Sequence, residues 1–195
     1  MSEDISKFRK KDFGTDDLFL NRWSPRALNG ESLSDDDLMS LFEAARWAPS
    51  SYNSQPWRFI YATKDSDEWS SFFDLLNDFN KSWAKNASAL VIVVSRKNFE
   101  YNEKFSPTHS FDTGSAWMSL ALQASLKGLV AHGMGGFDHD KARIIASIPE
   151  NFSVEAMIAI GTPGSISDLP DSLKESEFPK GRKSVSEIAF RGKLK

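Results

Sequence analysis

The stretch Ala48-Pro49-Ser50-Ser51-Tyr52-Asn53-Ser54-Gln55-Pro56-Trp57 joins a predicted helix to a predicted strand and carries the most information in the sequence. It contains no acid, base or thiol, but it lines up hydroxyls and primary amides between two prolines that keep the backbone extended. Such side chains are poorly suited to proton transfer at neutral pH and well suited to reading a flat ligand by hydrogen bonds. The stretch therefore predicts a segment that holds a cofactor.

Regular patterns flank this stretch on both sides. Apolar residues recur at helical spacing between Leu33 and Trp47, with Ser34 as the predicted N-cap and Asp37 as its capping-box partner. Alternation over 57–62 predicts a strand. Further helices are expected over 67–85, 111–127 and 139–148, and further strands over 89–95, 129–131, 154–161 and 184–190. Alternating helices and strands predict a sheet covered by helices.

The composition limits the class of protein. A chain of 195 residues with 40% hydrophobic and 26% charged residues predicts one globular domain over 1–195, with a flexible segment at 1–14 and an extended tail at 162–195. A net charge of −3 is too small to indicate nucleic acid as a partner, and no apolar run is long enough for a membrane span. Cysteine is absent, which excludes thiolate chemistry and allows the expected cytoplasmic location.

Arg22-Trp23-Ser24-Pro25-Arg26 is a second candidate cluster. Two guanidinium groups beside a hydroxyl can bind the oxygens of a phosphate through charge-assisted hydrogen bonds. The alternative is that the arginines are solvated or pair with the nearby acids Asp16, Asp17 and Glu31. A second basic group, Lys180, Arg182 and Lys183, either serves the same anion or forms a solvated surface.

Gly133-Met134-Gly135-Gly136 lies between a short predicted strand and a helix that Asp138 caps. It either brings backbone N–H groups close to a ligand or forms a flexible turn. The spacing of the dinucleotide-binding fingerprint is absent, as are the phosphate-binding loop, the nucleophile elbow and the zinc-protease helix motif. No metal site is expected.

Together these clusters resemble the nitroreductase family of FMN-dependent oxidoreductases, most specifically at Pro-Ser-Ser-x-Asn-x-Gln-Pro-Trp over 49–57. The resemblance implies an α+β fold of three layers, with a central mixed sheet flanked by helices. It also implies a homodimer with FMN sites at the interface and a C-terminal extension that wraps the partner subunit. The long tail and the aromatic content of 12% agree with such an interface.

The same resemblance implies the cofactor-binding residues. Arg22 and Ser24 hold the FMN phosphate with Lys180 or Arg182, while the polar residues of 50–55 come from the partner subunit. Two glycines place backbone N–H groups near flavin N5. The full set is Arg22, Trp23, Ser24, Arg26, Ser50, Ser51, Asn53, Gln55, Gly135, Gly136, Lys180 and Arg182.

The activity that the resemblance implies is that of an NAD(P)H-dependent flavin oxidoreductase. In a ping-pong cycle, NADH or NADPH delivers hydride to flavin N5, and a nitroaromatic, quinone or similar electron-poor small molecule is then reduced. No catalytic side chain is expected, which agrees with a motif that lacks acids and bases. Two alternatives are a flavin-binding storage or sensor protein without turnover and an interaction module whose Trp and Phe residues bind a partner protein.

Overall fold

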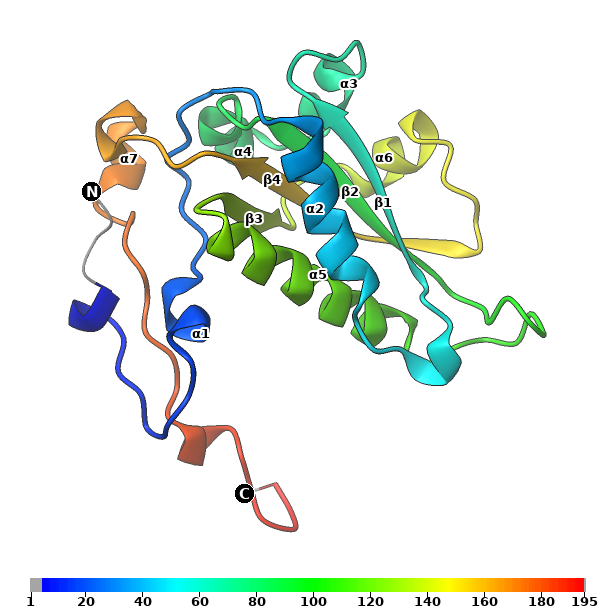
Figure 1. Ribbon diagram of the computed structural model, residues 1–195. Coiled ribbons are helices and arrows are strands. Elements are labelled where there is room, and N and C mark those ends of the chain that lie inside the picture. The colour runs from blue at the N-terminus through cyan, green and yellow to red at the C-terminus, as the bar shows by residue number, and fades with distance from the viewer. Residues whose placement is uncertain (1–4, 195) are drawn as a thin grey trace.

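The computed structural model describes residues 5–194 and contains a four-stranded sheet with helices on both faces (Figure 1). The strands lie in the order β1-β2-β4-β3, and each neighbouring pair is antiparallel. The strands are β1 (Trp57–Thr63), β2 (Ala89–Arg96), β3 (Val130–Met134) and β4 (Phe152–Gly161). The α-helices are α1 (Asp17–Asn21), α2 (Asp35–Arg46), α3 (Trp69–Phe73), α4 (Asp78–Ala84), α5 (His109–Leu126), α6 (His139–Ile145) and α7 (Asp171–Lys174).

The all-antiparallel pairing differs from the mixed sheet that the resemblance implied. Strands β2 and β3 are joined through α5 and run in the same direction, as a crossover connection requires. Strand β4, however, inserts between them and pairs antiparallel with both. The crossover is therefore a split β-α-β unit, and no parallel pair is hydrogen-bonded among the described strands.

Strand β2 explains why the molecule has three layers. Leu90, Ile92 and Val94 face a cluster that includes α3, α4 and α6, whereas Val91 and Val93 face a cluster formed with α2 and α5. Burying each such aliphatic side chain is worth about 1.5–3 kcal/mol. Both faces are covered, so the strand reads as a continuous apolar run, and the expected three-layer arrangement is confirmed.

Side-chain caps set several helix boundaries. Ser34 Oγ accepts the N–H of Asp37 at 3.1 Å at the start of α2, and Asp138 Oδ1 accepts the N–H of Lys141 at 2.9 Å at the start of α6, as the sequence predicts. The helix predicted over 67–85 is instead broken into α3 and α4. Asn77 causes the break, because its side chain caps Asn80 at 2.9 Å while its own N–H donates to the carbonyl of Gly136.

The two terminal segments run side by side, away from the sheet (Figure 1). The rings of Phe8 and Phe178 stack with centroids 5.4 Å apart, and the N–H of Val185 donates to Asp12 at 2.7 Å. Short 3-10 helices mark both segments: Ile5–Lys7, Ile166–Asp168 and Val185–Glu187, with another at Ser51–Asn53. The strand predicted over 184–190 is wrong, because a capping box between Ser184 and Glu187 starts a helical turn there. Residues 1–4 of the segment expected to be flexible lie outside the described residues.

Across residues 5–194, none of the helices has the length and hydrophobicity needed to cross a membrane.

Candidate active site

The terminal segments bring basic residues from both ends of the chain into one cavity of about 250 Å³, which we call the cationic pocket. Its lining includes five basic residues and one acid: Arg9, Arg22, Arg26, Lys180, Arg182 and Glu177, with Ser24 beside them. The guanidinium of Arg22 donates to Ser24 Oγ at 3.2 Å. Four of the residues predicted to bind phosphate, Arg22, Ser24, Lys180 and Arg182, are thus close together, and Lys180 rather than Lys183 lines the pocket.

Positive charge in the cationic pocket is poorly compensated. Among the described residues, no carboxylate forms an ion pair with Arg9, Arg22 or Arg182, so the alternative pairing with Asp16, Asp17 or Glu31 is not observed. Burial, followed by repulsion from Arg182, lowers the pKa of Arg22 below its usual range. Burial also lowers the pKa of Arg9, with further repulsion from Arg182 and Arg22. Converging cations of this kind favour binding of an anion.

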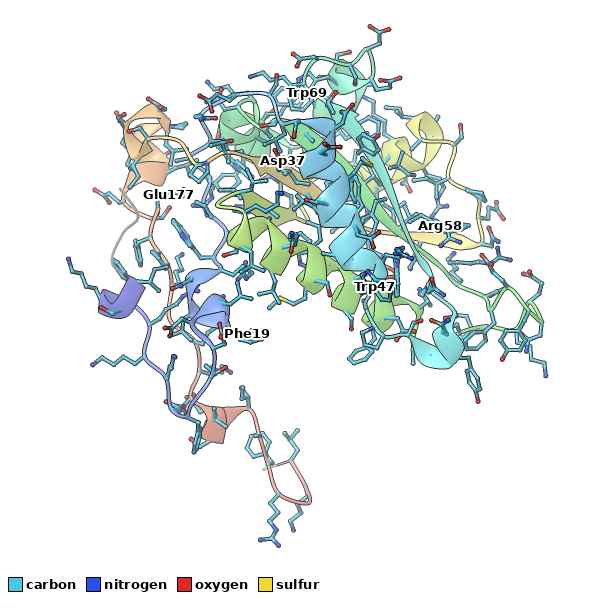
Figure 2. All side chains as sticks on the ribbon, in the orientation of Figure 1. Phe19, Asp37, Trp47, Arg58, Trp69 and Glu177 are labelled. Atoms are coloured by element: carbon cyan, nitrogen blue, oxygen red, sulfur yellow. The ribbon has the colours of Figure 1, made fainter. Side chains whose placement is uncertain are left out.

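Arg26 is held differently, by the acid Glu177 on the chain that follows α7 (Figure 2). The Glu177 side chain is only 1% exposed, and its carboxylate lies 3.4 Å from the Arg26 guanidinium. The same carboxylate accepts the backbone N–H of Ala27 at 2.9 Å and that of Arg26 at 2.5 Å. Glu177 therefore fixes the 22–26 loop to the tail. Its role could not be predicted from the sequence, because Glu177 follows Glu175 and Ser176 in a polar stretch that gives no sign of burial.

Arg9 was also missed, because it lies in a segment of mixed charge without a motif. Its guanidinium donates to the carbonyl of Arg22 at 2.9 Å and to that of Lys180 at 3.0 Å. One side chain thus ties the N-terminal segment, the 22–26 loop and the tail together. Arg9 both adds charge to the cationic pocket and fixes its walls.

The imidazole of His132 on β3 closes the inner side of the cationic pocket. Its Nδ1–H donates to the carbonyl of Pro25 at 2.9 Å, and its ring packs on Trp83 with centroids 4.6 Å apart. Burial lowers the pKa of His132, and this outweighs the opposing effect of the Pro25 carbonyl. The folded protein therefore favours neutral His132.

This lowered pKa predicts a pH dependence of stability. In the unfolded chain His132 takes up a proton at about pH 6.5, whereas in the folded chain it does so only at lower pH. The contribution of neutral His132 is therefore fully present above that pH and is lost as the pH falls toward the folded pKa. We expect the free energy of unfolding of the parent to fall more steeply on acidification than that of His132→Gln, measured by urea denaturation. Parallel pH curves would contradict this.

The glycine turn, residues 133–136, lies at the end of β3, the edge strand whose His132 lines the cationic pocket. Within the described residues, the N–H groups of Gly135 and Gly136 donate to no protein acceptor. The carbonyl of Gly136 accepts a hydrogen bond from the side-chain amide of Asn80 at 3.0 Å, so Asn80 stabilises the turn. At about 3.3 Å per residue, Gly135 lies roughly 10 Å along the chain from His132.

Residues 50–55, which we call the polar arm, lie elsewhere. The N–H of Ser51 donates to Asp112 at the start of α5, whereas Ala121 and Ser125 near its end line the cavity that shares Arg22 with the cationic pocket. At 1.5 Å rise per residue, Asp112 and Ser125 are about 20 Å apart. Figure 1 shows the polar arm at the opposite end of α5 from α1. Within one chain, the structure does not bring the polar arm to the cationic pocket.

Comparison with known proteins places this geometry in a family. The model of the nitroreductase family matches residues 20–81, which hold both the 22–26 loop and the polar arm. A crystal structure described as an oxidoreductase containing FMN is 48% identical to this chain, covers 96% of both chains and superposes with a TM-score of 0.92. The chain belongs to the nitroreductase family. The expected family and fold are thereby confirmed.

Two curated relatives of this nitroreductase-family chain have lower sequence identity than that crystal structure, and one of them aligns over a shorter part of the chain. A putative NADH dehydrogenase/NAD(P)H nitroreductase of Archaeoglobus fulgidus is 25% identical over 78% of this chain and 87% of that protein. An oxygen-insensitive NADPH nitroreductase of Helicobacter acinonychis is 40% identical, but over only 35% of this chain and 32% of that protein. This second match spans about a third of the Helicobacter protein.

Proposed function

We propose that this protein is an FMN-dependent NAD(P)H oxidoreductase that reduces nitroaromatics, quinones or similar electron-poor small molecules. One observation carries the proposal: a pocket in which Arg9, Arg22 and Arg182 pair with no carboxylate of residues 5–194 lies beside the same edge strand as a turn whose two glycine N–H groups donate to no acceptor in that range. Their separation of roughly 10 Å along the chain suits an elongated ligand with a phosphate at one end and a planar, hydrogen-bonding ring system at the other.

The residues present fit FMN by their chemistry. Arg22, Arg182 and Lys180 supply charge-assisted donors for a phosphate, with Ser24 as a neutral donor. A Cβ atom added at Gly135 would meet no atom of the described residues within 4 Å, its two chain neighbours aside, so there is open space beside the glycine turn. Trp23 lines the cationic pocket and would limit its width. Arg26 is engaged by Glu177, and we assign it to support of the 22–26 loop as much as to the ligand.

The polar arm requires a second copy of the chain in this proposal. Ser50 Oγ accepts the N–H of Gln55 at 3.0 Å, whereas the side chains of Asn53 and Gln55 lie in exposed positions. Because the polar arm and the cationic pocket lie at opposite ends of α5, we infer that each FMN site combines the pocket of one subunit with the arm of the other. Phe111, Met118 and Leu126 expose an apolar side of α5 that suits such a homodimer.

When bound, FMN would supply the redox chemistry, accepting a hydride at N5 from NADH or NADPH and passing electrons to the acceptor. The chain binds and orients the ligand. The cations of the pocket anchor a phosphate, and the N–H groups of the glycine turn stabilise negative charge that develops beside them. No side chain in the proposed set needs to move a proton. A cytoplasmic location, which the cysteine-free sequence allows, is part of the proposal.

The test is the visible absorbance spectrum of the purified protein under argon, before and after NADPH or NADH is added. We expect a flavin spectrum that bleaches with the nicotinamide and returns when a nitroaromatic or quinone is added. A coloured protein that does not bleach would support the storage or sensor alternative. A protein that is colourless and takes up no FMN would overturn the proposal and favour an interaction module.

Two neighbouring glycines provide a matched pair of variants. A Cβ at Gly136 would lie 2.4 Å from the Asn77 amide nitrogen and 2.9 Å from that of Asn80, so Gly136→Ala must displace the cap of α4. We expect it to lower stability by about 1–3 kcal/mol in thermal unfolding of the apoprotein. Gly135→Ala should leave that unfolding unchanged but weaken FMN binding, because its methyl group enters the open space. Equal effects of the two substitutions on apoprotein stability would contradict this.

A further inference from the structure

A buried acid supports the polar arm from outside it. Asp112, in the first turn of α5, is only 4% exposed. Its carboxylate accepts the backbone N–H of Ser51 at 3.0 Å and the hydroxyl of Thr108 at 3.0 Å. Within residues 5–194 it forms no ion pair, so these hydrogen bonds and the positive end of α5 compensate its burial. A carboxylate at this depth is costly unless such contacts hold it, so Asp112 and the Ser51 N–H are fixed relative to each other.

The polar arm needs such support because its backbone is strained. Tyr52, Asn53 and Gln55 have φ values of 51°, 53° and 46°. These values lie in the left-handed region, which residues other than glycine rarely adopt. Such conformations persist only where surrounding contacts enforce them, and they concentrate at ligand-binding sites.

Hydrogen bonds inside the arm brace it. The N–H of Gln55 donates to Ser50 Oγ and the Gln55 side-chain amide donates to the carbonyl of Asn53, each at 3.0 Å, and two backbone bonds of 3.0 Å, Asn53 to Ser50 and Ser54 to Ser51, close the turn. Outside the arm, the ring of Tyr52 packs against Phe99 with centroids 5.7 Å apart, although Tyr52 is 81% exposed. The hydrogen bond to Asp112 is the polar contact that joins the arm to α5.

We propose that Asp112 is a positioning residue that holds the polar arm in its cofactor-binding conformation and fixes it to α5. The expected effect on FMN affinity rests on the proposed function. The expected effect on the conformation of the polar arm does not. Asp112 accepts the N–H of Ser51 and so anchors the start of the left-handed turn at Tyr52 and Asn53. Without this anchor, the arm relaxes from its strained form, and binding must first restore it.

The experiment compares Asp112→Asn, whose amide oxygen can still accept from Ser51, with Asp112→Leu, which has a similar shape and no acceptor. Thr113→Val is the matched control, because Thr113 is buried beside Asp112 and its hydroxyl donates to the carbonyl of His109, one turn earlier in the same helix. Two quantities are measured on the full-length apoprotein: the hydrogen-exchange rates of amides 50–55, and the Kd for FMN by quenching of flavin fluorescence.

We expect Asp112→Leu to speed exchange in the polar arm and to raise the Kd for FMN, each by about tenfold or more. Asp112→Asn should stay within about threefold of the parent, and Thr113→Val within about twofold. Parent-like exchange in Asp112→Leu, or failure of Asp112→Asn to restore it, would overturn the proposal. Where Asp112→Leu does not fold, Asp112→Ser replaces it, because a serine hydroxyl is too short to reach Ser51.

A parent apoprotein that does not bind FMN would refute the proposed function. The exchange rates would then still decide whether Asp112 holds the polar arm, so the two failures are distinguishable.

Discussion

Arg22→Ala is expected to raise the Kd for FMN by about 10- to 100-fold. A charge-assisted hydrogen bond to phosphate contributes about 1.5–3 kcal/mol, and Arg22 is a half-buried cation of the pocket that no carboxylate pairs with in the described chain. Titration of the apoprotein with FMN, followed by flavin fluorescence, measures the change. The loss should be larger at low ionic strength, because added salt screens the same interaction in the parent.

Lys141→Ala is the control for charge, because it removes one positive charge from the exposed side of α6, outside the cationic pocket. It should leave the Kd within about twofold of the parent. If both substitutions weaken binding equally, overall charge rather than the pocket controls affinity. If Arg22→Ala retains FMN as tightly as the parent, the phosphate role of Arg22 is wrong.

Glu177→Leu is expected to lower the free energy of unfolding by about 3 kcal/mol. The substitution leaves the buried N–H of Ala27 and the half-buried N–H of Arg26 without an acceptor, and the Arg26 guanidinium without its partner. For a chain of this size, that corresponds to a fall in Tm of about 6–12 °C. Differential scanning calorimetry of the apoprotein gives the value.

Two further variants make this prediction specific. Glu177→Gln keeps an acceptor for both N–H groups and should recover about half of the loss, while Glu175→Gln changes an exposed acid in the same tail and should have no effect. If Glu177→Leu only releases the tail from the 22–26 loop, proteolysis at 176–194 would be faster and the Tm would be unchanged. That outcome would show that Glu177 anchors the tail without supporting the core.

Local chemistry explains which parts of the fold could be predicted. The cap at Ser34, the cap at Asp138 and the apolar run of β2 depend on neighbours in sequence, and all three are confirmed. The break at Asn77 depends on the carbonyl of Gly136, and the insertion of β4 between β2 and β3 depends on tertiary packing. Neither leaves a periodic signal in the sequence.

The same distinction applies to the site. The 22–26 loop, the polar arm and the glycine turn are compact motifs. The side chains of the first two and the backbone N–H groups of the third together predicted a bound cofactor from the sequence. Arg9 and Glu177 have no motif, because their importance comes from carbonyls and N–H groups that are distant in the chain. Asp112 is similar, since an acid near a helix start is adequately explained by the helix dipole. The roles of the residues in binding FMN stay predictions.

The placement of the polar arm and the cationic pocket at opposite ends of α5 has a genetic consequence. If two chains share each site, one chain defective in the pocket and another defective in the arm can complement each other. In a mixed dimer, the sound pocket of one chain meets the sound arm of the other, while both lesions fall together in the second site. Random pairing of Arg22→Ala with Asp112→Leu chains would then restore about a quarter of all sites, although neither protein alone holds FMN well.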